Sequence, residues 1–163
     1  MKTEELQKWI GKTEERTDVL TSFPATALAA TLNHKELDYS ENKKLPPLWH
    51  WLYFLPIFRL SEAGYDGHAA LGDFLPPVPL PRRMWAGSRI NFLSPLKLGN
   101  EYKKISTIKS VSAKSGRSGN LVFVTVTHEV SSDGSICINE EHDIVYREKA
   151  TSSSASAKLV EAP

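Results

Sequence analysis

Side chains that could move a proton occur at two places in the sequence. Asp66 and His68 lie two residues apart in the glycine-rich stretch GYDGH and could act as an acid–base pair. His50 lies among aromatic residues in PLWHWLYF. A histidine in such surroundings is more often a hydrogen-bonded core residue, and polar residues in a glycine-rich loop equally suit a turn. The catalytic and the structural interpretation therefore both stay open for these three residues.

Basic side chains that could bind a phosphate form two clusters. Arg82 and Arg83 follow directly after PPVPLP, and Lys114 and Arg117 lie in AKSGRSGN. Arginine suits phosphate because its planar guanidinium presents several N–H donors, and small turn residues expose backbone N–H groups to an anion. The alternative for the arginines is solvation or pairing with nearby aspartates, and the alternative for the second cluster is an ordinary polar hairpin turn.

The proline-rich segment before Arg82 allows two interpretations. Pro76 and Pro79 form a PxxP pattern, which in an exposed segment can dock on the aromatic groove of another protein. As an internal wall, the same prolines need no hydrogen-bond partner for a backbone N–H and hold the chain extended. The apolar neighbours Phe74 and Trp85 suit burial, which favours the wall.

Several kinds of site have no pattern in the sequence. There is no GxSxG motif and no glycine-rich nucleotide loop. Five histidines without HExxH or comparable spacing, and a single cysteine, Cys137, offer neither a metal cluster nor an intramolecular disulfide. We therefore expect no metal and no resident cofactor.

Composition limits the classes of partner and compartment. The 163 residues include 40% apolar and 24% charged residues, as in ordinary globular proteins. A formal net charge of +1 gives no general attraction to nucleic acid or to acidic membranes. The polar start MKTEELQKWIGK does not read as a signal peptide, and no apolar run reaches the ~20 residues of a membrane span. We expect a soluble protein in the cytoplasm, or in the mitochondrial matrix of a eukaryote.

The elements that must position these side chains divide the chain into halves. Helical patterns cover residues 3–10 and 22–33, and residues 12–21 are expected to be extended. Residues 33–85 are mostly loop-like around the apolar run LWHWLYFLP, which predicts either a strand or a buried turn. Loops of this length inside a compact domain are usually functional.

The second half predicts an antiparallel meander. Residues 89–111 form two strands around the Gly99–Asn100 turn, and further strands cover 121–130 and 136–147. A helix followed by such a sheet is α+β, and one antiparallel sheet wrapped around one helix fits the length. The folded domain covers residues 1–147, and the Ser- and Ala-rich segment 148–163 is expected to be a flexible tail or linker.

Three long stretches carry a family resemblance: LPPLWHWLYFLP, GYDGHAALGDFLPPVPLPRRMWAGSRINFLSPLKLGN and KSGRSGNLVFVTVTHEV with EEHDIVYR. They resemble the N-terminal half of the MaoC-like hydratases and dehydratases, a half also called the FAS1-like dehydratase domain. The most similar branch contains mesaconyl-C4-CoA (itaconyl-CoA) hydratases and 3-hydroxyacyl-thioester dehydratases. The resemblance implies a hot-dog fold and an acyl thioester carried on coenzyme A or acyl carrier protein.

The resemblance also implies a reaction and a binding site. Water adds reversibly across the C2=C3 bond of an enoyl thioester, which needs a base, an acid and donors to the thioester oxygen. For the carrier phosphates it favours Arg82 and Arg83, with Lys114 and Arg117 second. The residues expected to line the acyl groove are Trp49, Trp51 and Trp85.

One departure from the family concerns catalysis. Its catalytic pair is an aspartate followed five residues later by a histidine, but here Asn33 stands where an aspartate is expected, and Lys43 follows Asp38 at that spacing. We therefore expect a substrate-binding, non-catalytic half or subunit that a second MaoC-type hot dog completes, as a homodimer or heterodimer. The alternatives are a self-sufficient hydratase using His50 or Asp66 with His68, and an interaction module acting through PxxP.

Overall fold

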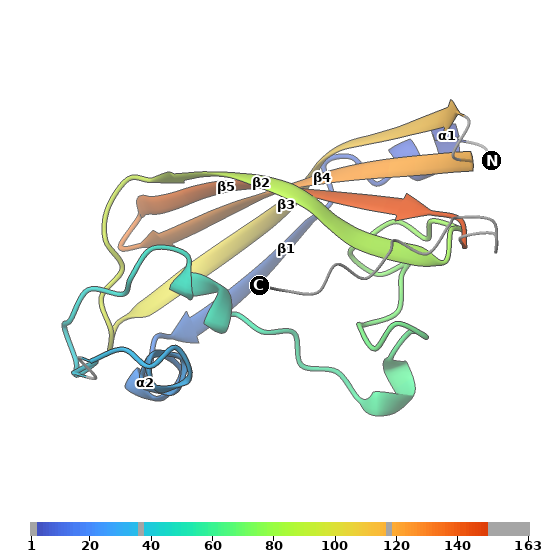
Figure 1. Cartoon of the computed structure of the whole chain (residues 1–163). Coiled ribbons are helices and arrows are strands. Elements are labelled where there is room, and N and C mark those ends of the chain that lie inside the picture. Colours follow the sequence, from blue (N-terminus) through green and yellow to red (C-terminus); the bar gives the residue numbers. More distant parts are fainter. Residues whose placement is uncertain (1–2, 36–37, 117–118, 150–163) are drawn as a thin grey trace.

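A computed structural model describes residues 3–35, 38–116 and 119–149 of the chain. These residues form two α-helices, two short 3-10 turns and one sheet, and Figure 1 shows their arrangement. The helical elements are α1 (Thr3–Gln7), α2 (Ser22–Thr31), η1 (Trp49–Leu52) and η2 (Leu60–Glu62). The strands are β1 (Thr13–Val19), β2 (Arg82–Phe92), β3 (Glu101–Gly116), β4 (Gly119–Ser132) and β5 (Ser135–Arg147).

The five strands form one antiparallel sheet in the order β1-β3-β4-β5-β2. The predicted meander of β3, β4 and β5 is confirmed. Strands β1 and β2, the first two along the chain, lie at the two opposite edges (Figure 1). The sheet together with the helices gives the α+β class that the sequence predicts.

The prediction for β2 was wrong in two respects. The strand begins at Arg82 instead of Arg89, because the proline run ends at Pro81 and every residue from Arg82 to Phe92 has a backbone N–H to donate. It also pairs with β5, so β2 and β3 are not a hairpin around Gly99. The segment 93–100 instead passes from one edge of the sheet toward the other and buries Leu96 and Leu98.

The face of the sheet that carries Val122, Val124 and Tyr146, called here the inner face, is covered by two separate apolar clusters. The first lies under α2 and the segment around η1, and it contains Ala25, Tyr53, Phe54, Leu98, Val130 and Ile138 among others. The second lies under α1 and the proline-rich segment, and it contains Leu6, Val78, Leu80, Val126, Ile144 and Tyr146 among others.

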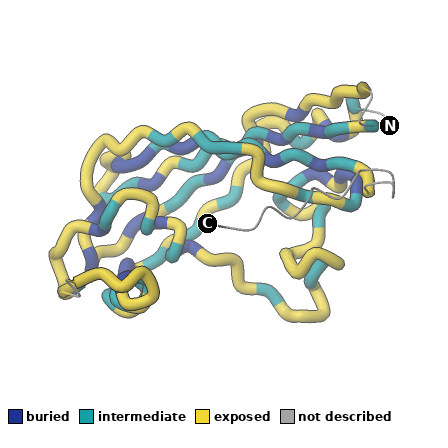
Figure 2. The backbone as a smooth tube through the Cα atoms, in the orientation of Figure 1, coloured by how far each residue is buried: buried dark blue, intermediate teal, exposed yellow. Residues whose placement is uncertain are grey.

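The long connection between α2 and β2 positions the covering residues. The apolar run at its centre forms the turn η1, in which only His50 is buried, and this is closer to the turn than to the strand that the sequence left open. After η1 the chain extends away from the sheet over residues 55–70, called here the arm, which Figure 2 shows mostly as exposed. The predicted tail begins at Glu148, and from residue 150 onward it lies outside the described residues.

Candidate functional site

Polar side chains cross the inner face of the sheet between the two apolar clusters. Ser106 on β3 lies opposite His128 on β4, which in turn lies opposite Glu140 on β5. His142 lies two residues beyond Glu140 and therefore on the same face. Ser106 and Glu140 are buried, and His128 and His142 are half-buried. These four residues, called here the polar stripe, form a buried polar region where an apolar core is usual.

The carboxylate of Glu140 receives three hydrogen bonds. Trp51 Nε1 and Ser88 Oγ each donate at 3.0 Å, and His50 Nε2 lies 3.3 Å from the same carboxylate. Burial raises the pKa of Glu140, but the bonds from His50, Trp51 and Ser88 lower it further, to about 2. Glu140 is therefore ionised at neutral pH. In this form its carboxylate accepts hydrogen bonds and has no proton to donate.

The ring of His50 is enclosed. Its side chain is 5% exposed, and the turn η1, which follows Leu48 in the left-handed region (φ 72°), holds the ring over Glu140. Nε2 faces the carboxylate, and the other ring nitrogen, Nδ1, is buried without a hydrogen-bond partner among the described residues. A substrate therefore has no access to Nδ1 of His50 in this structure.

The two histidines of the polar stripe are held in their neutral form. Burial, with help from the neighbouring Lys104, lowers the pKa of His128 to about 4. His128 Nδ1 lies 2.9 Å from Ser106 Oγ, and its ring centre is 6.0 Å from that of His142. Burial also lowers the pKa of His142. At neutral pH this part of the site can give or accept single hydrogen bonds without adding positive charge.

A cavity of about 560 Å³ lies against the polar stripe. Its walls come from η1 and the following residues, from β2 and from the inner face of the sheet. The lining residues are His50, Trp51, Tyr53, Phe54, Leu55, Pro56, His68, Trp85, Lys104, His128, Val130, Glu140 and His142. Its volume lies in the range of small-molecule sites, which combine apolar and aromatic walls with a few polar groups. We call it the main cavity.

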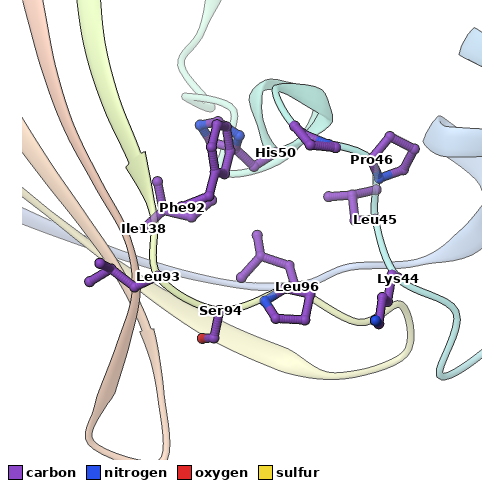
Figure 3. Close-up of a pocket in the computed structure, with 11 residues that line it drawn as sticks. Lys44, Leu45, Pro46, His50, Phe92, Leu93, Ser94, Leu96 and Ile138 are labelled. Carbon is purple, nitrogen blue, oxygen red and sulfur yellow. The ribbon is translucent and has the colours of Figure 1, made fainter.

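A second cavity, of about 410 Å³, lies on another side of His50. Figure 3 shows it between the segment that carries Leu45 and Pro46 and the chain from Phe92 to Leu96. Its wall is predominantly apolar and contains neither a carboxylate nor an aromatic residue of the predicted groove. His50 therefore lies between the two cavities, and the polar side chains of the stripe line the main cavity.

The structure brings part of the predicted groove together. Trp51 and Trp85 line the main cavity with His50 and His68. Trp51 is 47% and Trp85 64% exposed, so both indole rings are open to a ligand. Trp49 lies elsewhere, because its ring stacks on Tyr39 at 5.3 Å and packs against the first apolar cluster.

The predicted basic residues divide between the two faces of the sheet. Arg82 and Arg83 are consecutive on β2, so their side chains point to opposite faces. Arg83 lies on the inner face and forms an ion pair with Asp66 at 2.9 Å, one of the alternatives that the sequence left open. Arg82 lies on the outer face and is paired with Arg147. Arg147 is paired with Leu121, and Leu121 with Lys114, so Arg82 and Lys114 lie in one row across the outer face. Arg117 lies outside the described residues.

The Asp66 and His68 pair lies on the exposed arm. Asp66 also accepts the backbone N–H of His68 at 3.2 Å, and the pKa of Asp66 is lowered because this bond and Arg83 outweigh the effect of burial. The His68 side chain is 70% exposed, and its Nδ1 lies 3.7 Å from Asp66 Oδ2. Asp66 therefore acts first as the partner of Arg83, while His68 reaches the rim of the main cavity.

The proline-rich segment packs as an internal wall. Pro76, Val78 and Leu80 are buried at alternate positions, and the two apolar side chains join the second cluster. Pro76, the first proline of the PxxP pattern, would have to leave the core to dock on another protein. The structure thus contradicts the interpretation of this segment as an exposed ligand.

The polar residues that define the site have a faint signal in the sequence. In EEHDIVY, Glu140 and His142 lie two residues apart on one face of the strand, and the residue between them points to the other face. A half-buried strand usually has apolar side chains on the face that Glu140 and His142 occupy. His128 and Ser106 follow the same pattern on their own strands. Neither Glu140 nor Lys104 was predicted from the sequence, because their burial depends on the pairing of distant strands.

Two kinds of feature are missing from the part of the chain that the structure describes. No group of three or more His, Cys, Asp or Glu side chains is placed to hold a metal ion. None of the helices combines the length and the apolar composition needed to cross a membrane.

Comparison with known proteins adds a family match and a fold match. Residues 48–163 match the family model described as hydroxyacyl-thioester dehydratase type 2. Mesaconyl-C(4)-CoA hydratase of Chloroflexus aurantiacus is 45% identical over 148 residues, which cover 91% of this chain and 53% of that protein. The chain therefore spans about half the length of this relative.

A solved structure shows the same fold. A chain of the ChsH1–ChsH2 complex from Mycobacterium tuberculosis superimposes with a TM-score of 0.66 at 11% identity, over 97% of this chain and 96% of the other. At this identity the likeness concerns the fold alone. The five-stranded antiparallel sheet with its helix is a hot-dog fold, as the resemblance implied.

Proposed function

Because the chain belongs to the hydroxyacyl-thioester dehydratase type 2 family, we propose that it is the substrate-binding hot-dog half of an enoyl-thioester hydratase. The proposed reaction is the reversible addition of water across the C2=C3 bond of an acyl thioester. Coenzyme A or acyl carrier protein carries the acyl group. A second hot dog with the aspartate and histidine pair completes the catalytic site.

The main cavity is the observation that carries this proposal. It is large enough for a short acyl group, and Trp51 and Trp85 give it the flat apolar surfaces that such a group needs. Glu140, His128 and His142 add a few fixed polar groups. The relative of known activity is a hydratase of an acyl-CoA, which agrees with a pocket of this kind.

The state of the ionisable groups supports a binding role over catalysis by this chain. Hydration needs a base that can reach water and an acid that can reach C2 of the substrate. Nδ1 of His50 is buried and its Nε2 faces Glu140, and Glu140 is an ionised acceptor with three donors already in place. The polar stripe can orient a substrate, but neither His50 nor Glu140 supplies both the base that reaches water and the acid that reaches C2.

The arm offers a surface for the second hot dog. Ile57 is 101% and Leu60 is 90% exposed, and Leu55 and Tyr65 are also exposed. Apolar side chains this open on one segment are typical of protein interfaces. We propose that this surface contacts the partner, which is either a second copy of the chain or a different chain with the catalytic pair.

The carrier phosphates bind, in this proposal, at the basic positions that the resemblance implies. Arg82 and Lys114 share one row of the outer face, whereas Arg83 is held by Asp66 on the inner face. Arg82 and Lys114 are accordingly the better candidates among the described residues. Both are exposed and can reach a phosphate without breaking an ion pair.

One pair of measurements tests the proposed function. The purified chain should bind butyryl-CoA, which has no double bond to hydrate, in isothermal titration calorimetry. The same chain should leave the enoyl absorbance of crotonyl-CoA unchanged until a hot-dog chain with the aspartate and histidine pair is added. Absence of butyryl-CoA binding, or rapid turnover by the chain alone, would contradict the proposal.

A second candidate function is hydration by this chain alone through His68. One observation favours it: His68 lies at the rim of the main cavity, with Asp66 3.7 Å from its Nδ1. In that case the chain alone would turn over crotonyl-CoA, and His68→Gln would abolish the turnover without changing butyryl-CoA affinity. If the variant and the natural chain were equally active, His68 would have no catalytic role.

A further inference from the structure

The two tryptophans on the wall of the main cavity are anchored on one carboxylate. Trp51 Nε1 donates to Glu140 Oε2 at 3.0 Å. Trp85 Nε1 donates to Ser88 Oγ at 3.2 Å, and Ser88 Oγ lies 3.0 Å from Glu140 Oε1. Each oxygen of the carboxylate therefore holds one tryptophan, directly in the case of Trp51 and through a serine in the case of Trp85.

The direction of these bonds follows from the chemistry of the three groups. An indole N–H can only donate, and an ionised carboxylate can only accept. A hydroxyl has one proton to donate and two lone pairs that accept, so it can join a donor to an acceptor. Ser88 therefore accepts from Trp85 and donates to Glu140, which links an exposed ring to a buried anion.

A β-bulge in β2 places Trp85 and Ser88 on the same face of the sheet. Along a regular strand, residues three apart point to opposite faces. The register between β2 and β5 shifts between Trp85 and Gly87, so that Trp85 lies opposite Ile144 and Ser88 opposite His142, both on the inner face. Bulges re-aim side chains in this way, and here the bulge brings a hydroxyl within reach of the indole.

The position of the Trp85 ring depends on this hydrogen bond. Trp85 lies on an edge strand, and its side chain is open to solvent, so packing against neighbours does not fix the ring. Trp51 is also exposed and is held by its bond to Glu140. The room that the two rings leave for a ligand is therefore set by a network whose two ends meet at one carboxylate.

We propose that Ser88 is a positioning residue of the acyl site, which holds Trp85 in place and so restricts the site to narrow acyl groups without a quaternary carbon. This inference rests on the proposed function, because it assumes that the main cavity holds the acyl group. Ser88 is not among the residues that line the cavity, so it acts on the ligand through Trp85. Flat indole faces at fixed positions admit a narrow chain, whereas a quaternary carbon is wide in every direction.

Two saturated thioesters test this selectivity, because neither has a double bond to hydrate. Butyryl-CoA and 3,3-dimethylbutyryl-CoA have the same main chain, and the second has two further methyl groups at C3. Their dissociation constants would be measured by isothermal titration calorimetry with the full chain. The natural chain should bind butyryl-CoA about 10-fold more tightly, since a wall that cannot move makes the extra methyl groups unfavourable.

Substitutions assign this selectivity to the hydroxyl. Ser88→Ala should bring the ratio of the two dissociation constants close to one, and Ser88→Thr, which keeps a hydroxyl, should retain most of it. Thr125→Val is the matched control, because Thr125 Oγ1 donates to Asp143 at 2.8 Å on the outer face of the same sheet. If Ser88→Ala does not fold by near-ultraviolet circular dichroism, Ser88→Cys, whose thiol is a weak donor and acceptor, replaces it.

A double-mutant cycle separates positioning from a purely structural role. Trp85→Ala removes the ring that Ser88 holds, so adding Ser88→Ala to it should leave the ratio of dissociation constants unchanged. In the natural chain, the same Ser88→Ala substitution should change the ratio. A hydroxyl that only stabilised the fold would lower the melting temperature and alter neither ratio.

The outcomes separate the inference from the proposed function. Equal affinity of the natural chain for the two thioesters, or an unchanged ratio in Ser88→Ala, overturns the role of Ser88 and leaves acyl-CoA binding intact. A further change of the ratio when Ser88→Ala is added to Trp85→Ala also overturns it, because Ser88 would then act on the ligand without Trp85. If the natural chain binds neither thioester, the proposed function fails and the inference fails with it.

Discussion

Replacement of Glu140 by glutamine removes the charge at the centre of the polar stripe and keeps the size of the side chain. The amide has one oxygen in place of two, so its NH₂ group must face either Trp51 Nε1, which donates to Oε2, or Ser88 Oγ, which donates to Oε1. The pKa of Glu140 is about 2 in the folded protein against an ordinary value of 4.5. At 1.36 kcal/mol per pKa unit, this difference corresponds to roughly 3 kcal/mol of unfolding free energy at neutral pH.

The effect has a defined pH window. A carboxyl group with a lowered folded-state pKa stabilises the protein above its unfolded pKa, and this stability is lost as pH falls through the folded pKa. The contribution of Glu140 is therefore complete above pH 4.5 and declines toward pH 2. Urea unfolding at pH 7 should show Glu140→Gln to be less stable by roughly 3 kcal/mol, and the gap should narrow below pH 4.5.

The neighbouring residue provides the control. Glu141 lies next to Glu140 on β5 but on the outer face, where it pairs with Arg89 and Lys109. Exposed pairs of this kind contribute about 1 kcal/mol or less, so Glu141→Gln should change the stability far less. If Glu140→Gln were as stable as the natural chain at pH 7, or if the gap did not depend on pH, Glu140 would not be the buried ionised acceptor described above.

Three further predictions concern the polar stripe, the wall of the main cavity and the proposed site of the carrier phosphates. Because burial lowers the pKa of His128 to about 4 from 6.5, the folded protein should lose stability as pH falls from 6.5 to 4, and His128→Asn should flatten this slope in urea unfolding; an unchanged slope would assign it to another group. Trp85→Ala should weaken butyryl-CoA binding about 10-fold with little effect on the melting temperature, since the ring is exposed on the cavity wall. Trp49→Ala should lower the melting temperature with little effect on butyryl-CoA binding, because Trp49 packs on the core. If Trp85→Ala and Trp49→Ala lost butyryl-CoA affinity equally, the assignment of the main cavity as the acyl site would be contradicted. Arg82→Ala combined with Lys114→Ala should weaken coenzyme A binding in calorimetry and make it less dependent on salt, and an unchanged affinity would move the carrier phosphates elsewhere.

The parts of the fold that follow from local pattern could be predicted. The β-branched run around Val122, Val124 and Val126 predicts strand β4, and the polar residues Thr125 and Thr127 mark the opposite face only in its second half. The glycines in AKSGRSGN and SSDGS place the two turns of the meander β3 to β5. The pairing of β2 with β5 could not be predicted in this way, because it depends on which edge of the sheet is free after a long connection.

The residues of the site likewise divide into those that could be predicted from the sequence and those that could not. Trp51 and Trp85 could be predicted as groove residues from the family resemblance, and the structure places both on the main cavity. Glu140 and Lys104 could not, since a charged residue in a strand is normally exposed and only the three-dimensional pairing shows that these two face inward. The partnership of Arg83 with Asp66 likewise depends on a contact across the folded arm.

The separation of the two apolar clusters has a consequence for how this domain tolerates change. Val126 and Val130 lie on the same strand but belong to different clusters, with His128 between them. Because the clusters have no residue in common, substitutions in one should add to those in the other with little coupling energy. A substitution in the polar stripe between the clusters, such as Glu140→Gln, should therefore lower the stability of the domain without altering the packing within either cluster.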